Sequence, residues 1–447
     1  MRASMPPVVA FALLCALPRA QGIQPAATRR VVINGAGAAA GSAFGLLGVA
    51  HADVAAPEAA AESLAAPRVA ATEALTSVSW AATDGFDSDF PSPISFIEFD
   101  DKAYKAMRDD ARRTPKFAKA IAARLAAHPG ELTVLDLGTG PYAVLALIAA
   151  KYGAKKVYAV EANPEAARRA RALIYRCETG DRGADGYFPL KPGQVVILDG
   201  FSTALELPEK VDLVVAEICG SIASEEGLYA TMRDARERHV KYPDSEDSYI
   251  PRRCQTFAAP VSYALHSLLE APAFDWGKVV GNPIRFNCRD EALQLLAAPQ
   301  LLEDIDFSKP LPAPGKPISR SVSFEVDAGV LANTEKKFAL ALKEERQLSA
   351  LVNKTDDIPR LSKQLSTAFS GMALWPTLVL DGETSVRSRG PVGEHQKSHW
   401  QTVLELMAAA PVAVRAGDRV EIDFDVTLEN DVTKPLRYDL RGKVVRA

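Results

Sequence analysis

The sequence lacks the features of several large protein classes. Only five of its 447 residues are cysteines, and no two of them form a C-x-x-C pair. This argues against a disulfide framework and against a zinc site, so we expect no metal and reduced or buried thiols. The 52 basic and 56 acidic residues give a net charge of −4, which argues against a nucleic-acid-binding protein. Apolar runs are too short to span a bilayer stably, so we expect no membrane span in the mature chain.

The first 52 residues have the composition of a two-part targeting leader. Residues 1–22 combine Arg2, an apolar core and a small-residue end, which is typical of a secretory signal peptide. Residues 29–52 begin with two arginines and end in Ala-His-Ala, which resembles a twin-arginine signal. We therefore predict a plastid protein that is imported across extra membranes, with the thylakoid lumen indicated by the second part. The secretory pathway is the alternative.

The rest of the chain divides by composition and periodicity. Residues 53–95 are rich in Ala, Ser and Pro, which predicts a flexible linker. Residues 96–251 begin with a helical pattern and then alternate strands with helices, which predicts a parallel, doubly wound α/β sheet. Residues 252–447 contain strand patterns without regular helical crossovers. They predict a second, mostly antiparallel β domain, with a helical insertion at about 334–368.

The most informative stretch is a β-α-β pattern that runs from Val134 to Glu161. Its first strand leads into Gly138-Thr139-Gly140, a turn that glycine enters at little cost and that lets a ligand approach the backbone. Its second strand ends in Glu161, an acid that can accept both hydroxyls of a ribose. The pattern predicts a site for a nucleoside-containing cofactor. It also fits a G-x-G-x-x-A dinucleotide fingerprint, so a nicotinamide-dependent oxidoreductase is an alternative at this point.

Three further motifs stand in a fixed order around this turn. They are Met107-Arg108-Asp109-Asp110-Ala111-Arg112-Arg113-Thr114, the segment from Glu217 to Glu226 (EICGSIASEE), and Ser398-His399-Trp400-Gln401. Together with the turn they resemble the protein arginine N-methyltransferase family, which are class I S-adenosylmethionine-dependent methyltransferases. The resemblance covers roughly residues 96–446. It implies an α/β fold, in which a Rossmann-like, doubly wound methyltransferase domain is followed by a mostly antiparallel β-barrel-like domain.

The resemblance also implies an acceptor site. Its substrate would be an arginine-bearing protein, and two convergent carboxylates, Glu217 and Glu226, would hold the guanidinium through forked, charge-assisted hydrogen bonds. His399 would pair with Asp110 and link the β domain to the cofactor lid, while Trp400 would wall the arginine channel. Glu225 is an additional acid that we expect to be solvated. Homodimers are common in the family, so a homodimer is expected here.

The methyl donor implied by the resemblance is S-adenosyl-L-methionine. The family arginine that binds the donor's carboxylate corresponds to Arg113, and Glu161 would hold the ribose. The positions implied to contact the donor are Arg113, Asp136, Gly138, Gly140, Glu161, Ser202 and Thr203.

The sequence departs from the family pattern at two positions near the donor. Tyr142 stands where a third glycine is usual, so its side chain either crowds the donor or turns outward. Thr203 stands where a glutamate usually reads the adenine, which leaves Ser202 or backbone groups for that role. Two alternatives follow: a methyltransferase of the same fold with a different acceptor, and a scaffold protein that has lost catalysis.

Overall fold

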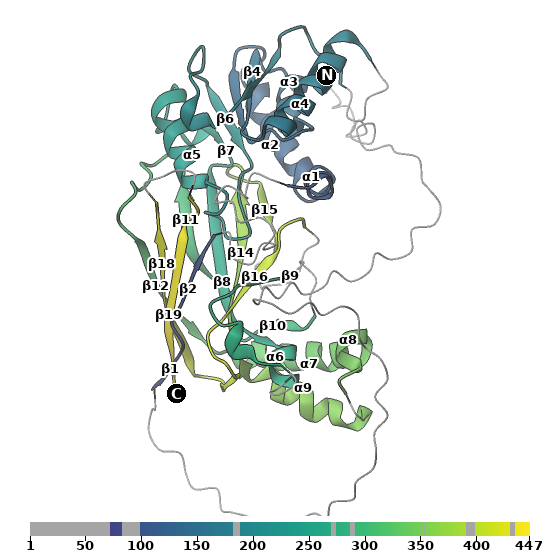
Figure 1. Ribbon diagram of the computed structural model, residues 1–447, viewed down its shortest axis with the longest axis vertical. Helices are drawn as coiled ribbons and strands as arrows, with labels where there is room; N and C mark the ends of the chain where they lie inside the picture. The colour runs from purple at the N-terminus through teal and green to yellow at the C-terminus, as the bar shows by residue number, and fades with distance from the viewer. Residues whose placement is uncertain are drawn as a thin grey trace, which may run out of the picture.

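The computed structural model describes residues 72–82, 99–181, 188–269, 274–286, 291–352, 354–389, 398–429 and 434–447. The predicted leader, residues 1–52, lies outside the described residues. A parallel α/β unit forms one end of the molecule, and long antiparallel strands extend from it toward a helical layer at the other end (Figure 1). Among the helices described, none is long and apolar enough to cross a bilayer. The described cysteines, Cys177, Cys219 and Cys254, are buried and not in disulfides.

The α/β unit is built on a parallel sheet, as the alternating pattern predicts. Its strand order is β5-β4-β3-β6-β7, and each neighbouring pair is parallel. The strands are β3 (Thr133–Leu137), β4 (Lys156–Glu161), β5 (Val195–Asp199), β6 (Leu213–Ala216) and β7 (Tyr249–Ile250). The central strand β3 is buried along its whole length, because helices cover both faces of such a sheet. The chain order reverses at β3, and ligands bind at the carboxyl ends of strands at this point.

The helices of this unit begin and end at signals that the sequence carries. The helix after β4 is capped by Asn163, whose side chain accepts hydrogen bonds from Glu165 N and Ala166 N, and it ends before Gly180 at φ +79°. The helices are α1 (Asp101–Arg108), α2 (Thr114–Ala126), α3 (Val144–Lys151), α4 (Pro164–Thr179) and α5 (Leu228–Asp234).

The second domain is antiparallel, as predicted. One sheet has the order β1-β19-β18-β12, with β2 also on β19, and the other has the order β10-β8-β14-β16-β9, with β11 on β8 and β15 on β14. A short third pair joins β13 to β17. The strands are β1 (Thr72–Ala74), β2 (Val78–Ala81), β8 (Arg253–Tyr263), β9 (Ile284–Phe286), β10 (Leu293–Leu295), β11 (Gln300–Asp306), β12 (Ile318–Glu325), β13 (Ala368–Phe369), β14 (Gly371–Val379), β15 (Ser385–Arg387), β16 (Thr402–Leu406), β17 (Val412–Ala413), β18 (Arg419–Thr427) and β19 (Arg437–Val445).

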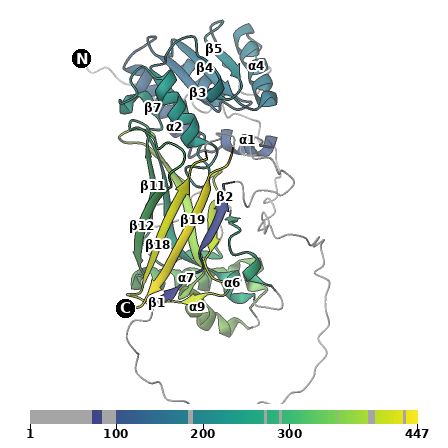
Figure 2. The same cartoon turned by 60° about the vertical axis from the view of Figure 1, so that its left-hand side comes forward.

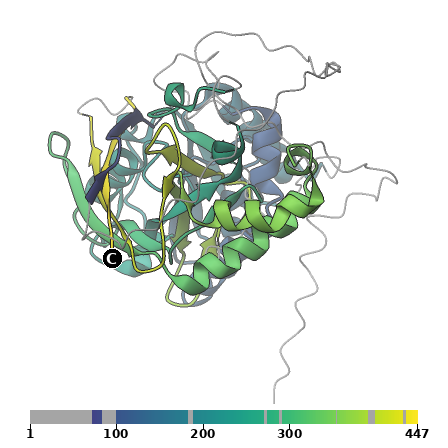
Figure 3. The same cartoon turned by 90° about the horizontal axis from the view of Figure 1, so that it is seen from below.

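A helical layer closes one end of the antiparallel sheets (Figure 3). It contains α7 (Ala328–Glu344), α8 (Arg346–Ser349) and α9 (Ile358–Ser366), and a short helix, α6 (Ala264–Leu268), follows β8. The insertion therefore begins at Ala328, earlier than the predicted residue 334, because Asp327 caps the helix by accepting from Val330 N.

The prediction of a flexible linker over residues 53–95 is wrong for residues 72–82. Strands β1 and β2 pair with β19 in antiparallel register, with Thr72 opposite Val445 and Ala81 opposite Arg437. They lie beside the yellow C-terminal strand (Figure 2). The unpaired edge of β19 offers backbone groups that a nearby segment can bond. Burial alternates from Val78 through Trp80, a two-residue period that the Ala- and Ser-rich composition obscured.

Candidate active site

A cavity of about 1170 Å³, counted to its open mouth, lies at the carboxyl ends of β3, β4 and β6. All seven predicted donor-contacting residues line it, as do both predicted acceptor glutamates. Asp110, His399 and Trp400 are not among the residues that line it. The predicted donor and acceptor residues are spread over the sequence from Arg113 to Glu226, and the fold brings all of them to this one cavity.

The glycine turn forms the floor of this cavity. Gly138 and Gly140 have φ of +71° and +64°, a region that favours glycine. A Cβ on Gly138 would lie 2.7 Å from Cγ2 of Ile218. The carboxylate of Glu161 closes the turn, because it accepts from Gly140 N at 2.7 Å and from Asn163 N at 2.8 Å. Each carboxylate oxygen has a second lone pair, so Glu161 keeps the capacity to accept from a ligand.

Asp136 is the second acid under the turn. It is 1% exposed, and its Oδ2 accepts from Thr139 Oγ1 at 2.6 Å and from Ala146 N at 3.0 Å. Within the described residues, its Oδ1 is buried without a hydrogen-bond partner. Burial raises the pKa of Asp136 to about 6, and burial also raises the pKa of Glu161. A ligand that brings hydroxyl donors or positive charge therefore fits this end of the cavity.

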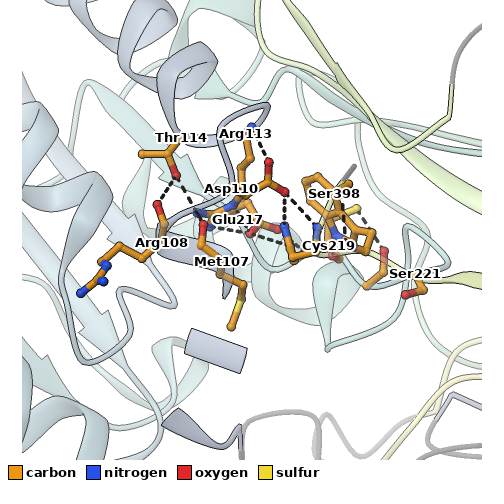
Figure 4. A network of polar contacts seen from close by, with 12 residues as sticks. Met107, Arg108, Asp110, Arg113, Thr114, Glu217, Cys219, Ser221 and Ser398 are labelled. Atoms are coloured by element: carbon orange, nitrogen blue, oxygen red, sulfur yellow. Dashed lines mark hydrogen bonds and ion pairs between the residues drawn. The ribbon is translucent and has the colours of Figure 1, made fainter. Parts of the chain in front are cut away.

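The segment from Glu217 to Glu226, which we call the acid loop, follows β6. Glu217 is neutralised by Arg113, whose Nε and NH2 lie 2.6 Å and 2.5 Å from Glu217 Oε2 (Figure 4). A third donor of the same guanidinium, NH1, bonds to the carbonyl of Met107 at 3.2 Å. The side chains of Arg113 and Glu217 are only 8% and 3% exposed, so this ion pair is shielded from water.

Glu226, at the other end of the acid loop, has no such neutralising partner. In the part of the chain that the structure describes, its carboxylate makes no hydrogen bond or ion pair, and it lines the cavity. Burial raises its pKa well above the usual value, and the charges of Glu217 and Glu225 raise it further, against a smaller effect of Arg285 and Arg113. The cavity thus presents one uncompensated carboxylate, which favours a cationic ligand.

The structure brings together His399 and Asp110, the two residues that were expected to pair, next to the Arg113–Glu217 ion pair. His399 Nδ1 is 2.9 Å from Asp110 Oδ2, and His399 N donates to the same oxygen at 3.0 Å. Burial raises the pKa of Asp110, but the hydrogen bonds and charge of His399 offset this and lower it to about 2. His399 Nε2 is 3.9 Å from Glu217 Oε2. The His399–Asp110 pair links the loop before β16 to the segment between α1 and α2, and the His399–Glu217 contact links the same loop to the acid loop.

No protein-family model matches the sequence. The chain is 37% identical over 109 residues to protein arginine N-methyltransferase PRMT10 of Arabidopsis thaliana, which covers 24% of this chain and 25% of that protein. It is 32% identical over 180 residues to PRMT10 of Oryza sativa subsp. japonica (39% and 43%). It is 25% identical over 345 residues to protein arginine N-methyltransferase 6 of Xenopus laevis (74% and 82%). The matched region spans less than half the length of either PRMT10.

Two solved structures share the fold. Arabidopsis thaliana protein arginine methyltransferase 10 matches with a TM-score of 0.51 and 17% identity, over 79% of this chain and 99% of that chain. Trypanosoma brucei PRMT1, in an enzyme-prozyme heterotetrameric complex with AdoHcy, matches with a TM-score of 0.50 and 17% identity, over 74% and 89%. The chain is similar to protein arginine N-methyltransferases in sequence and in fold. The shared fold confirms the predicted fold class, a methyltransferase domain followed by a barrel-like domain.

Trp400 lies behind the acid loop rather than in the cavity wall. It is 4% exposed, and its Nε1 donates to the carbonyl of Cys219 at 2.6 Å. The next residue, Gln401, donates its backbone N–H to Ser221 Oγ at 3.1 Å. The structure therefore corrects the prediction that Trp400 walls a channel: its contacts support the backbone of the acid loop.

The expectation that Glu225 is solvated is wrong. Glu225 is 1% exposed and forms an ion pair with Arg285 of β9, with NH2 2.7 Å from Oε1. Its side chain packs against Gly220, where an added Cβ would lie 2.3 Å from Glu225 Cβ. The sequence alone could not reveal this pair, because Arg285 lies 60 residues further along the chain in another domain.

Tyr142 lines the cavity and contacts helices α1 and α4. Its hydroxyl donates to Asp101 Oδ1 at 3.1 Å, and the guanidinium carbons of Arg108 and Arg169 lie 4.7 Å and 5.5 Å from its ring centroid. The residue thus ties α1 to α4 at the mouth of the cavity. Tyr104 of α1 is a cavity residue that sequence reasoning missed, since its helical spacing signals only packing.

Proposed function

We propose that this chain is an S-adenosylmethionine-dependent methyltransferase that methylates guanidinium nitrogens of arginine side chains in proteins. The observation that carries this proposal is Glu226, an uncompensated carboxylate that faces the same cavity as the glycine turn and Glu161. A guanidinium is a planar cation that stays protonated in proteins, and a carboxylate can hold it through two parallel hydrogen bonds. The kinship with arginine methyltransferases supports the same acceptor.

The residues present fit the donor. Glu161 has lone pairs for the ribose hydroxyls, and the glycine turn allows close backbone approach. The unpaired Oδ1 of Asp136 favours a positively charged ligand nearby. Arg113 uses three of its five N–H donors in the contacts described above, so it keeps donors for a carboxylate. Ser202 and Thr203 line the same cavity, and we propose that they hold the adenine.

The donor supplies an electrophilic methyl group on a sulfonium, and the protein's contribution is orientation. Glu226 would hold the guanidinium, and the Arg113–Glu217 ion pair would fix another part of the cavity lining. Fixing two reactants in a productive arrangement can supply about 7–11 kcal/mol of the barrier. The guanidinium would bind in its cationic form, since that is the form that Glu226 attracts. Transfer of the methyl group would leave S-adenosylhomocysteine and release one proton from the methylated nitrogen, and Glu226, which holds the guanidinium, would accept that proton.

Calorimetry with S-adenosylhomocysteine tests the donor site directly. We expect saturable binding that Glu161→Ala weakens about 100-fold, because two hydrogen bonds to a charged acceptor contribute about 3 kcal/mol together. Glu165→Ala is the matched control, since Glu165 is an exposed glutamate near the same strand end. The acceptor is identified by mass spectrometry of an arginine peptide incubated with the wild-type chain and S-adenosylmethionine. Binding of NAD in place of S-adenosylhomocysteine would contradict the proposal.

We also propose that residues 1–52 direct the chain to a plastid and that the protein acts as a homodimer. The composition of residues 1–52 supports the targeting proposal. The homodimers that are common among protein arginine N-methyltransferases support the second proposal. A fluorescent protein fused to the full chain should enter plastids, and the same fusion without residues 1–52 should not. Equal localisation of both fusions would contradict the targeting proposal.

A further inference from the structure

Two chains of contacts run from the N-terminal segment, residues 72–82, to the acid loop. The first passes through rings. Trp80 is 1% exposed and stacks on Tyr438, with ring centroids 5.3 Å apart and an interplanar angle of 27°. The hydroxyl of Tyr438 is 2.9 Å from Ser224 Oγ. Tyr438 and Ser224 are both fully buried, so no water competes for this hydrogen bond.

The second series of contacts is made by charged side chains. Arg285 NH2 donates to the carbonyl of Ala82 at 3.4 Å, at the end of the N-terminal segment. The same nitrogen pairs with Glu225 Oε1 at 2.7 Å, and both side chains are almost completely buried. The backbone of Ala82 is itself fixed, because Ala82 N donates to Leu436 O at 2.7 Å.

Both chains of contacts end on the residues immediately before Glu226. Glu226 has a φ of +63°, which is unfavourable for a side-chain-bearing residue, and its carboxylate has no partner of its own among the described residues. Its direction is therefore set by the backbone at Ser224 and Glu225. Ala82 and Glu226 also line a second cavity, of about 450 Å³, next to the first.

We propose that residues 72–82 are a positioning segment, which holds Ser224 and Glu225 so that Glu226 faces the cavity. The expected effect on the rate of methylation rests on the proposed function, whereas the positioning of the acid loop does not. Strands β1 and β2 pair with the two ends of β19, and further backbone bonds, from Leu75 N to Gly442 O and from Thr76 N to Met407 O, fasten the segment between the two strands. Residues 72–82, which precede both predicted domains in the sequence, thus help to hold the acid loop in place.

Hydrogen exchange by mass spectrometry on the full chain tests the positioning without relying on activity. Trp80→Leu and Tyr438→Phe should each speed amide exchange in the acid loop about tenfold or more, because each breaks the ring pathway to Ser224. The matched controls are Trp375→Leu and Tyr249→Phe. The first removes a buried indole of β14, which packs in a different apolar cluster from Trp80 and Tyr438, and the second removes a hydroxyl that bonds to Pro243 O. These controls should destabilise the protein without a selective effect on the acid loop.

The kinetic readout separates the two proposals. For an active wild-type chain, Tyr438→Phe should lower kcat about tenfold while the affinity for S-adenosylhomocysteine is unchanged, and Tyr249→Phe should lower neither. Tyr438→Phe combined with Ser224→Ala should lower kcat no further than Ser224→Ala alone, since the hydrogen bond between Tyr438 and Ser224 is already lost in Ser224→Ala. Faster loop exchange in an inactive wild-type chain would support positioning and reject the proposed function. If Tyr438→Phe leaves amide exchange in the acid loop unchanged, the positioning proposal is overturned, whether or not the protein is active. This outcome can be measured even if Trp80→Leu fails to fold.

Discussion

Replacing Glu226 with glutamine should lower kcat/KM for arginine methylation about 100- to 1000-fold, while the affinity for S-adenosylhomocysteine stays the same. Glutamine keeps the shape of the side chain but removes the charge and one acceptor, so the guanidinium loses its forked partner. Glu226 contacts the cavity but is not one of the groups that close the glycine turn, which is why donor binding should survive. Steady-state kinetics on an arginine peptide, with calorimetry in parallel, measures both quantities.

The matched control is Glu237→Gln, which neutralises an exposed glutamate on the helical turn Ala235–His239. It should leave kcat/KM unchanged. An equal loss in both variants would mean that the overall charge, and not a held guanidinium, sets the rate.

The role of Glu226 also predicts how kcat/KM depends on pH. The pKa of Glu226 is raised well above 4.5, so the carboxylate that binds a guanidinium forms only as the pH rises through that raised value. The kcat/KM of the wild-type chain should therefore increase with pH over this range. Glu226→Gln should remove this component of the profile, whereas Glu237→Gln should keep it.

The sequence allowed the donor half of the site to be predicted in detail, because its information is local. Gly138, Gly140 and Glu161 lie within one β-α-β unit, and their spacing alone places the acid against the turn. The pairing of Asp110 with His399 spans 289 residues, and only the resemblance to a family could suggest it. The same resemblance misplaced Trp400, because a motif gives the position of a residue and not the direction of its side chain.

What sequence reasoning missed has a common physical cause. Glu225, the N-terminal segment and Tyr142 each take their role from a partner on a distant element: Arg285, β19 and the guanidinium groups of α1 and α4. Composition classified the first as solvated and the second as a linker, since charge and small residues usually indicate exposure. Tertiary partners reversed both assignments. The acceptor side of the site is thus held by contacts between domains, whereas the donor side is held within one.

Arg285→Met should produce a large loss of stability, about 3–5 kcal/mol in the free energy of unfolding. The substitution leaves Glu225 buried and without its ion-pair partner, which is costly in a region that excludes water. Chemical denaturation of the full chain measures this difference. The control is Arg253→Met, which breaks an ion pair with Asp304 in which the Arg253 side chain is 41% exposed. That change should cost less than about 1 kcal/mol.

The double variant Arg285→Met with Glu225→Met separates stability from positioning. Removing both charges of a buried pair often restores stability, because the desolvation of the two ions no longer has to be offset. We therefore expect the double variant to recover most of the lost free energy of unfolding. If the pair serves only to stabilise the fold, arginine methylation should recover with it. Because the ion pair also fixes the backbone beside Glu226, we expect methylation to stay low in a stable protein, with donor binding intact.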